Sequence, residues 1–251
     1  MSIQLVKAGE QGRGQFNNGE ILEYKPIGFP QDGGKLKPYS NLFYWAHAWT
    51  DTGSTIGEHP HQGFEILSFV LEGSIEHYDN KQEGWNVLNK GDAQVIRSGN
   101  GISHAEKLNK GAHMFQIWFD PDLSKAINKP ASYNDYQNDQ FYIGFEQGHS
   151  VKVYAGPKGI MKLDTPGIVI KEYSYERGMH SFSMNLNNCY SLYIIDGEGE
   201  IINEDQKVII EKEDFVVMKK INLVNINFIK PAIVFVIISE IEIPYKTYPY
   251  L

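Results

Sequence analysis

HPHQGFE, at residues 59–65, is the stretch that decides the fold of this chain, and GISHAE, at residues 101–106, is its partner downstream. Each stretch places two possible metal ligands at positions i and i+2: His59 with His61, and His104 with Glu106. In an extended strand such side chains point to one face, with Cα atoms roughly 6.5–7 Å apart. Two of them can bind one ion, because metal–nitrogen and metal–oxygen bonds are about 2.0–2.2 Å long. Two such pairs on neighbouring strands predict a site of three histidines and one carboxylate.

The segments around these stretches favour short β-strands. Residues 41–49 are rich in aromatic side chains, and residues 64–71, 92–97 and 112–119 follow with turn residues between them. No helical period is found before residue 122, so the pattern predicts an all-β sandwich or barrel. Residues 121–138 are polar and do not alternate, which predicts a linker with room for one short helix.

The two halves of the chain look like copies of each other. VLEG at residues 70–73 resembles IIDG at residues 194–197, and GDAQVI at residues 91–96 resembles EDFVVM at residues 213–218. Each motif match defines an offset in residue number between the two halves. If these offsets are kept constant, the counterparts of His59, His61, Glu65, His104 and Glu106 are Ser183, Asn185, Cys189, Ile226 and Phe228, in that order. The second copy is therefore expected to keep the scaffold and to have lost every ligand.

These motifs resemble the pirin family of the cupin superfamily, whose signature is HPHRGFE, a leucine-glutamate-glycine turn, GD, and G-x-G-x-x-H-x-E. Here the first motif has Gln62 in place of the arginine, which leaves the role of that position open, and the others are Leu71 to Gly73, Gly91-Asp92 and residues 99–106. The resemblance implies two tandem cupin barrels of the double-stranded β-helix (jelly-roll) type. We expect an N-terminal metal-binding domain at residues 1–125, a linker at 126–145 and a degenerate domain without ligands at 146–251.

The resemblance also implies a ligand set. Pirins hold their metal with both histidines of HPH and with the histidine and glutamate of H-x-E, which are His59, His61, His104 and Glu106 here. If the strand continues regularly from His59, Glu65 lies on the same face, and many cupins use a glutamate at that place. Glu65 is therefore an alternative ligand or a supporting neighbour. The resemblance favours Fe(II), and nitrogen and oxygen ligands also suit Mn, Co, Ni, Cu and Zn.

Three imidazoles and one carboxylate leave two positions open on an octahedral ion, which suits catalysis better than a closed structural site. Some pirins resemble quercetin 2,3-dioxygenases in activity, which implies a flavonol-like or other enolic substrate and O2, with Glu106 as general base. The sequence assigns no substrate-binding residue. The alternative is a metal- or redox-sensing regulatory protein that acts through protein partners.

The bulk composition excludes several other classes. A formal net charge of −8 argues against nucleic acid as a partner, because phosphate binding requires clustered Lys and Arg. No apolar run reaches the roughly 18 residues needed for a membrane span, and residues 1–15 lack the apolar core of a secretory signal. Cys189 is the only cysteine, so no internal disulfide is possible. We expect a cytoplasmic protein, with His47, His77 and His113 at the surface or hydrogen-bonded in the core.

Overall fold

The computed structural model describes residues 2–80, 84–204 and 206–247, and within them the chain is all-β, as predicted. The described residues form two compact units, here called the first and second barrel. The first barrel consists of residues 11–80, 84–140, 162–166 and 244–247, and the second of residues 2–10, 141–161, 167–204 and 206–243. No helix in the described residues is long and apolar enough to cross a membrane.

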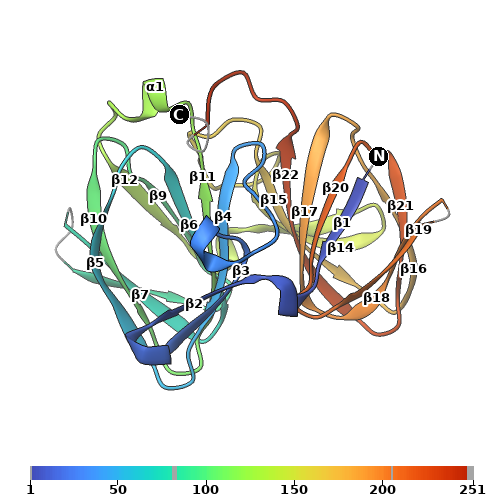
Figure 1. The fold of residues 1–251 in the computed structure, drawn as a ribbon, viewed down its shortest axis with the longest axis horizontal. Helices are drawn as coiled ribbons and strands as arrows, with labels where there is room; N and C mark the ends of the chain where they lie inside the picture. Colours follow the sequence, from blue (N-terminus) through green and yellow to red (C-terminus); the bar gives the residue numbers. More distant parts are fainter. Residues whose placement is uncertain (1, 81–83, 205, 248–251) are drawn as a thin grey trace. The chain divides into compact units, whose positions relative to one another are not determined.

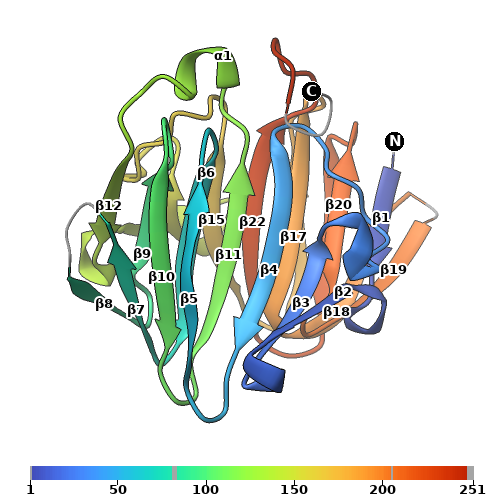
Figure 2. The same ribbon diagram turned by 60° about the vertical axis from the view of Figure 1, so that its left-hand side comes forward.

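The first barrel contains two antiparallel sheets, ordered β12-β9-β6-β11-β4-β3-β2 and β5-β10-β7-β8 (Figure 1). Figure 2 shows β6, β11, β4 and β3 side by side. Its strands are β2 (Gly12–Phe16), β3 (Ile21–Ile27), β4 (Leu42–Trp49), β5 (Ser54–His61), β6 (Glu65–Glu72), β7 (Ser74–Asp79), β8 (Trp85–Asn89), β9 (Ala93–Arg97), β10 (Ile102–Leu108), β11 (His113–Phe119) and β12 (Ser132–Tyr136). Its short helical segments are η2 (Asn17–Gly19), η3 (Pro30–Asp32), α1 (Leu123–Ala126) and η4 (Asn138–Gln140).

The second barrel repeats this arrangement strand for strand, with sheets ordered β1-β20-β17-β22-β15-β14-β13 and β16-β21-β18-β19. Its elements are β1 (Ser2–Val6), η1 (Ala8–Glu10), β13 (Tyr142–Glu146), β14 (His149–Ala155), β15 (Val169–Tyr175), β16 (Gly178–Ser183), β17 (Asn188–Asp196), β18 (Glu198–Asn203), β19 (Gln206–Glu211), β20 (Phe215–Lys219), β21 (Leu223–Phe228) and β22 (Ala232–Glu240). The shared strand order confirms that the two halves are copies.

The division into barrels differs from the expected boundaries at residues 125 and 146. Strand β1 pairs with β20 of the second barrel, and β12 pairs with β9 of the first. The larger sheet of each barrel therefore has one of these two strands at its edge. Residues 126–145, expected to be a linker, contain β12 and most of β13. Both are edge strands with largely exposed side chains, and they therefore lack the apolar alternation that marks a half-buried strand.

The interior of the first barrel contains a polar layer between apolar clusters. On one side lie the buried side chains Ile21, Ala48, Val70, Ile75, Leu88, Leu108, Ala112 and Met114. On the other side lie two clusters that share Phe64 and Trp118: one around Phe43, Tyr44 and Ala46, the other around Ile66, Ile96 and Ile102. Each residue of the layer is two positions from an apolar interior residue on its own strand, and so faces the same way. The polar layer comprises Ser68, His77, Gln94, His104, Glu106 and Gln116.

The strand pairings show what replaces this layer in the second barrel. His77 pairs with Glu106. Its counterpart is Ile201, because each residue lies four positions after the turn glycine of its own half, and Ile201 pairs with Ile226. The same stepwise comparison places Phe182, Met184 and Val224 at the positions of His59, His61 and His104. All four replacements, Phe182, Met184, Val224 and Ile226, belong to one continuous apolar core.

Four of the five counterparts predicted for the second barrel were wrong. Ser183, Asn185, Ile226 and Phe228 were obtained with constant offsets, and the connections between strands differ in length between the copies. Cys189 does occupy the position of Glu65, because it pairs with Lys219 and Ser239 as Glu65 pairs with Arg97 and Phe119.

Candidate metal centre

A β-bulge aims the first histidine pair into the barrel. Strands β5 and β10 are antiparallel, with His104 opposite His59 and Glu106 opposite Ile56. Three steps along β5 therefore match two along β10, and the extra residue lies between Ile56 and His59. Ile56, His59 and His61 are all more buried than their exposed neighbours, so the bulge changes which residues face inward. Bulges commonly redirect side chains next to functional sites in this way.

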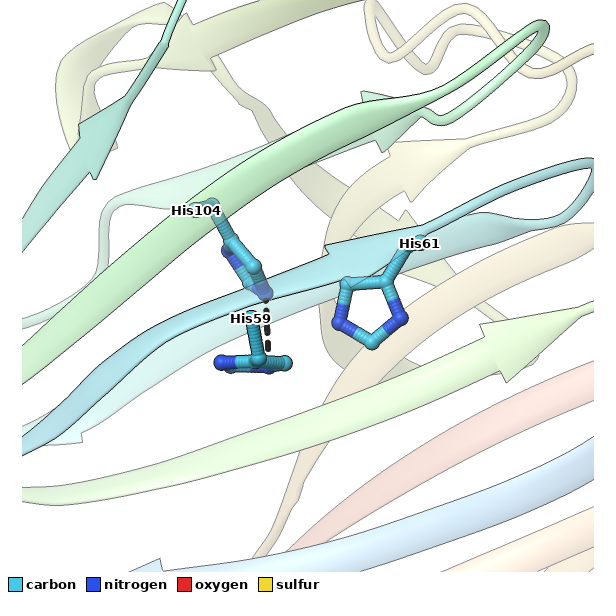
Figure 3. A group of neighbouring side chains, drawn as sticks. All are labelled: His59, His61 and His104. Carbon is cyan, nitrogen blue, oxygen red and sulfur yellow. Dashed lines mark hydrogen bonds between the residues drawn. The ribbon is translucent and has the colours of Figure 1, made fainter.

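His59, His61 and His104 converge on one point (Figure 3). A ligand nitrogen from each lies within 4.8 Å of those of the other two. The ring centroids are 4.6 Å apart for His59 and His104, 4.7 Å for His59 and His61, and 4.9 Å for His61 and His104. Within the described residues this is the one group of three or more His, Cys, Asp or Glu side chains close enough to share an ion.

The nitrogen atoms in this group fit a transition metal. The Nδ1 of His59 donates to the Gly57 carbonyl at 2.8 Å, which leaves the Nε2 lone pair facing the cluster. The Nε2 atoms of His59 and His104 are 3.1 Å apart, and two nitrogens at a right angle on one ion would be separated by about 3 Å. The Nε2 of His61 is buried and has no hydrogen-bond partner among the described residues, which is costly unless the atom binds a ligand.

The electrostatic environment favours the neutral forms of His61 and His104. Burial, followed by the neighbouring His104 and His59, lowers the pKa of His61 to about 3. Burial, followed by His59, lowers the pKa of His104 to about 3 as well. Neutral rings carry the free lone pairs that a metal requires at physiological pH.

Glu106 lies beside the cluster, but its carboxylate faces a different set of partners. Its side chain is buried, accepts a hydrogen bond from Ser68 Oγ at 3.3 Å, and accepts a second from Gln116 Nε2. Gln116 in turn accepts a hydrogen bond from Trp118 Nε1 at 3.2 Å. The Glu106 oxygens are not part of the group that lies within 4.8 Å. Its role as a fourth ligand stays a prediction that requires the carboxylate to turn.

Glu65 lies outside the histidine cluster. The strand is not regular through this region, because β5 ends at His61, Gly63 has a φ of 92° and β6 begins at Glu65. Glu65 is three residues from Ser68 and therefore faces away from the polar layer. Its carboxylate accepts hydrogen bonds from Asp164 N at 2.6 Å, from Thr165 N at 2.8 Å and from Thr165 Oγ1. The Nε of Arg97 lies 3.9 Å away, and burial raises the pKa of Glu65.

Gln62, which stands where the family signature has arginine, is exposed and donates to the Asn100 carbonyl at 3.3 Å. This contact joins the turn after β5 to the turn before β10. The position therefore supports the loops that lead into the two ligand strands.

Aromatic side chains that the sequence did not single out line the site next to His61. The Trp118 and Phe64 rings each lie 5.3 Å from the His61 ring and 5.0 Å from each other. Tyr44 stacks on Trp118 at 4.3 Å, and Phe29 lies 5.9 Å from Trp118. We call Phe29, Tyr44, Phe64 and Trp118 the aromatic wall. Trp118 could have been found by its i+2 spacing from Gln116 and Met114 on β11.

A buried His77–Asp79 pair lies on the other side of the cluster. The two side chains are joined by a 3.0 Å hydrogen bond, and the His77 ring is 5.6 Å from that of His104. His77 is thus a hydrogen-bonded core residue, as expected.

Comparison with known proteins finds a family similarity over part of the chain. Residues 35–119, which contain both histidine motifs, match the family model named Pirin. Over these residues the chain is similar to the pirin family. Among its relatives, quercetin 2,3-dioxygenase of Escherichia coli is 37% identical over 127 residues, which is 48% of this chain and 52% of that protein. The chain therefore spans about half the length of the curated relatives it matches.

Solved structures show the same fold over nearly the whole of this chain. The bacterial pirin YhhW in complex with nickel(II), from Escherichia coli, has a TM-score of 0.77 at 21% identity and covers 95% of this chain and 99% of that one. A quercetin 2,3-dioxygenase from Acinetobacter baumannii has a TM-score of 0.75 at 18% identity, with coverage of 96% and 86%.

Proposed function

We propose that this protein is a metal-dependent dioxygenase of the quercetin 2,3-dioxygenase type, which opens the ring of a flavonol-like or other enolic substrate with O2. The observation that carries the proposal is the convergence of three histidines whose ring nitrogens lie close enough together to share one ion. The named activity of the Escherichia coli relative supports it.

We assign the metal to His59, His61 and His104, with Glu106 as the fourth candidate ligand. Fe(II) is our proposed ion. The nickel(II) bound by the Escherichia coli pirin supports a first-row transition metal at such a fold. When bound, the metal would bring the substrate and O2 together and lower the barrier to their reaction.

We assign proton transfer to Glu106. In the proposed reaction the hydroxyl proton of the enolic substrate passes to the Glu106 carboxylate, which lies on β10 two residues from His104. Ser68 and Gln116 hold that carboxylate at fixed positions, which reduces the entropy lost when substrate binds.

The aromatic wall supports a planar substrate. Trp118 and Phe64 are only partly buried and lie beside His61, so their rings can contact a bound aromatic molecule. Ring stacking of this kind orients a flavonol-like substrate with its oxygens toward the histidines.

The test is metal content and oxygen uptake with quercetin and other enolic compounds, for wild type, His104→Ala and the control His180→Ala. His180 is a partly buried histidine of β16 in the second barrel. We expect a near-stoichiometric transition metal and oxygen uptake in wild type and the control, and loss of both in His104→Ala. If the wild-type protein cannot be loaded with any divalent ion, the proposal is wrong. Metal binding without uptake on any chelating substrate supports a metal- or redox-sensing regulator instead.

A further inference from the structure

His77 and His104 each have one buried ring nitrogen that the rest of the barrel leaves unpaired. The Nδ1 of His77 and the Nδ1 of His104 have no hydrogen-bond partner among the described residues. The two residues lie on the paired strands β7 and β10, and their ring centroids are 5.6 Å apart. Because an unpaired polar atom in a protein interior is costly, two of them this close together indicate a shared purpose.

The hydrogen bond to Asp79 determines which nitrogen of His77 carries the proton. The Nε2 of His77 lies 3.0 Å from Asp79 Oδ2, and both side chains are buried. An ionised carboxylate can only accept, so Nε2 donates and the Nδ1 of the neutral ring keeps a lone pair. The unpaired nitrogen of His77 is therefore an acceptor.

Metal binding answers the same question for His104. Its Nε2 lies 3.1 Å from the Nε2 of His59 and is the atom that faces the histidine cluster. With that nitrogen on an ion, the proton of the neutral ring is on Nδ1. Metal-binding histidines usually donate this proton to an acceptor outside the ligand set, which orients the ring and strengthens its bond to the metal. His104 thus has a buried donor beside the buried acceptor of His77.

The second barrel, which has apolar side chains at the positions of the histidine cluster, also lacks this pair. Strands β7 and β18 are each six residues long and each follow a turn glycine, so the counterparts of His77 and Asp79 are Ile201 and Asn203. Ile201 belongs to the apolar core and forms no hydrogen bond through its side chain. The histidine cluster and the His77–Asp79 pair therefore occur in the same barrel.

We propose that His77 is a positioning residue that accepts a hydrogen bond from the Nδ1–H of His104 in the metal-bound protein, and that Asp79 orients His77 for this contact. A tilt of either ring, or one water between them, closes the remaining distance. The carboxylate makes the His77 Nδ1 a better acceptor, and this in turn makes the His104 Nε2 a better ligand. The proposal rests on the metal assignment in the proposed function, and it does not depend on the substrate.

The experiment measures Zn(II) affinity by competition with a chelator. His77→Phe keeps a ring but removes the acceptor, and we expect it to raise the Zn(II) Kd roughly 10- to 100-fold. His77→Gln provides an amide oxygen as a replacement acceptor and should restore most of the affinity. Asp79→Asn removes the charge that orients His77 and should weaken binding by less than His77→Phe.

The chain provides a matched control in His113→Phe. His113 is a partly buried histidine of β11 in the same barrel, and its Nδ1 lies 3.1 Å from the Nε2 of another histidine, His47. The substitution breaks a contact between two histidines that are not in the cluster. We expect this variant to bind Zn(II) like wild type.

NMR of the imidazole nitrogens in the Zn(II)-bound protein gives a second readout that needs no variant. In wild type, His104 should carry its proton on Nδ1 and His77 should carry its proton on Nε2. The His104 proton should exchange slowly with water, exchange faster in His77→Phe and slow again in His77→Gln. A general loss of stability would not produce this recovery at one proton.

Two results for the variants overturn the proposal: unchanged Zn(II) affinity in His77→Phe, or a larger loss in Asp79→Asn than in His77→Phe, which would make the carboxylate the direct acceptor. A wild-type His77 with its proton on Nδ1 overturns it as well. Neither readout uses O2 or a substrate, so the expected Zn(II) results without oxygen uptake by the metal-loaded protein refute only the proposed function. A wild type that binds no Zn(II) refutes both.

Discussion

His59 and His104 lie directly opposite each other on the antiparallel strands β5 and β10, and their Nε2 atoms are 3.1 Å apart. Two neutral rings satisfy this geometry if one donates to the other. An ion satisfies it better, because it also engages His61 Nε2, which has no hydrogen-bond partner in the described structure. Metal binding and folding stability should therefore be coupled.

We predict that a divalent transition metal raises the Tm of wild type and not that of His59→Ala. At a metal concentration 100 times the Kd, binding adds about 2.7 kcal/mol of stability. For a chain of this size that corresponds to a rise of roughly 5–10 °C. Thermal melts with and without metal test this, with His180→Ala as the control that should respond like wild type.

We predict that the metal-free protein becomes less stable as the pH falls from about 6.5 toward 3. The pKa values of His61 and His104 are lowered to about 3 in the folded protein, from 6.5. Over this range the unfolded chain binds protons that the folded protein does not, so stability rises with pH and levels off above about 7. Urea titrations at several pH values measure the slope.

The variant His61→Met checks the origin of this slope. Met184 occupies the equivalent position in the second barrel, so a thioether is compatible with this strand environment. We expect a shallower pH dependence, because one buried imidazole is gone. A slope identical to wild type would assign the effect to other groups.

We predict that Glu65→Ala destabilises the protein by roughly 3 kcal/mol without changing its metal content, since three hydrogen bonds to a buried carboxylate are lost. Thr165→Val removes only the hydroxyl donor and should cost about 1 kcal/mol. Denaturant unfolding together with elemental analysis separates the two effects. Loss of metal in a folded Glu65→Ala protein would instead make Glu65 a ligand.

We predict that Phe29→Ala weakens flavonol binding several-fold and leaves metal content unchanged. Aromatic pairs contribute about 0.5–1.5 kcal/mol beyond the area they bury, and Phe29 is the partly buried edge of the aromatic wall. Titration of quercetin against the metal-bound protein provides the Kd. Phe145→Ala, at a phenylalanine that is 78% exposed in the second barrel, should bind like wild type.

The sequence predicted those features that depend on local spacing. The i, i+2 motifs identified the three histidines, and β-favouring runs bounded by turn residues located β4, β6, β9 and β11 within a few residues. The direction of the Glu106 carboxylate could not be predicted, because it depends on Ser68 and Gln116 from other strands. The partners of Glu65 lie about 100 residues away in sequence, and no local pattern reveals them.

The C-terminal tail packs on the first barrel in its described part. Tyr245 donates to the Asp120 carbonyl at 2.8 Å, within the first barrel. The remaining tail residues, 248–251, lie outside the described residues.

The polar layer has a consequence for the lifetime of the protein. The interior of the second barrel is built on Phe182, Met184, Val224 and Ile226 and is stable through apolar contacts alone. The interior of the first barrel has ionisable groups at the same positions and needs an ion to offset the cost of burying them. Metal starvation should therefore expose the first barrel to proteases before the second. Cellular abundance would then follow metal supply even at constant synthesis, and the amount of protein would itself report that supply.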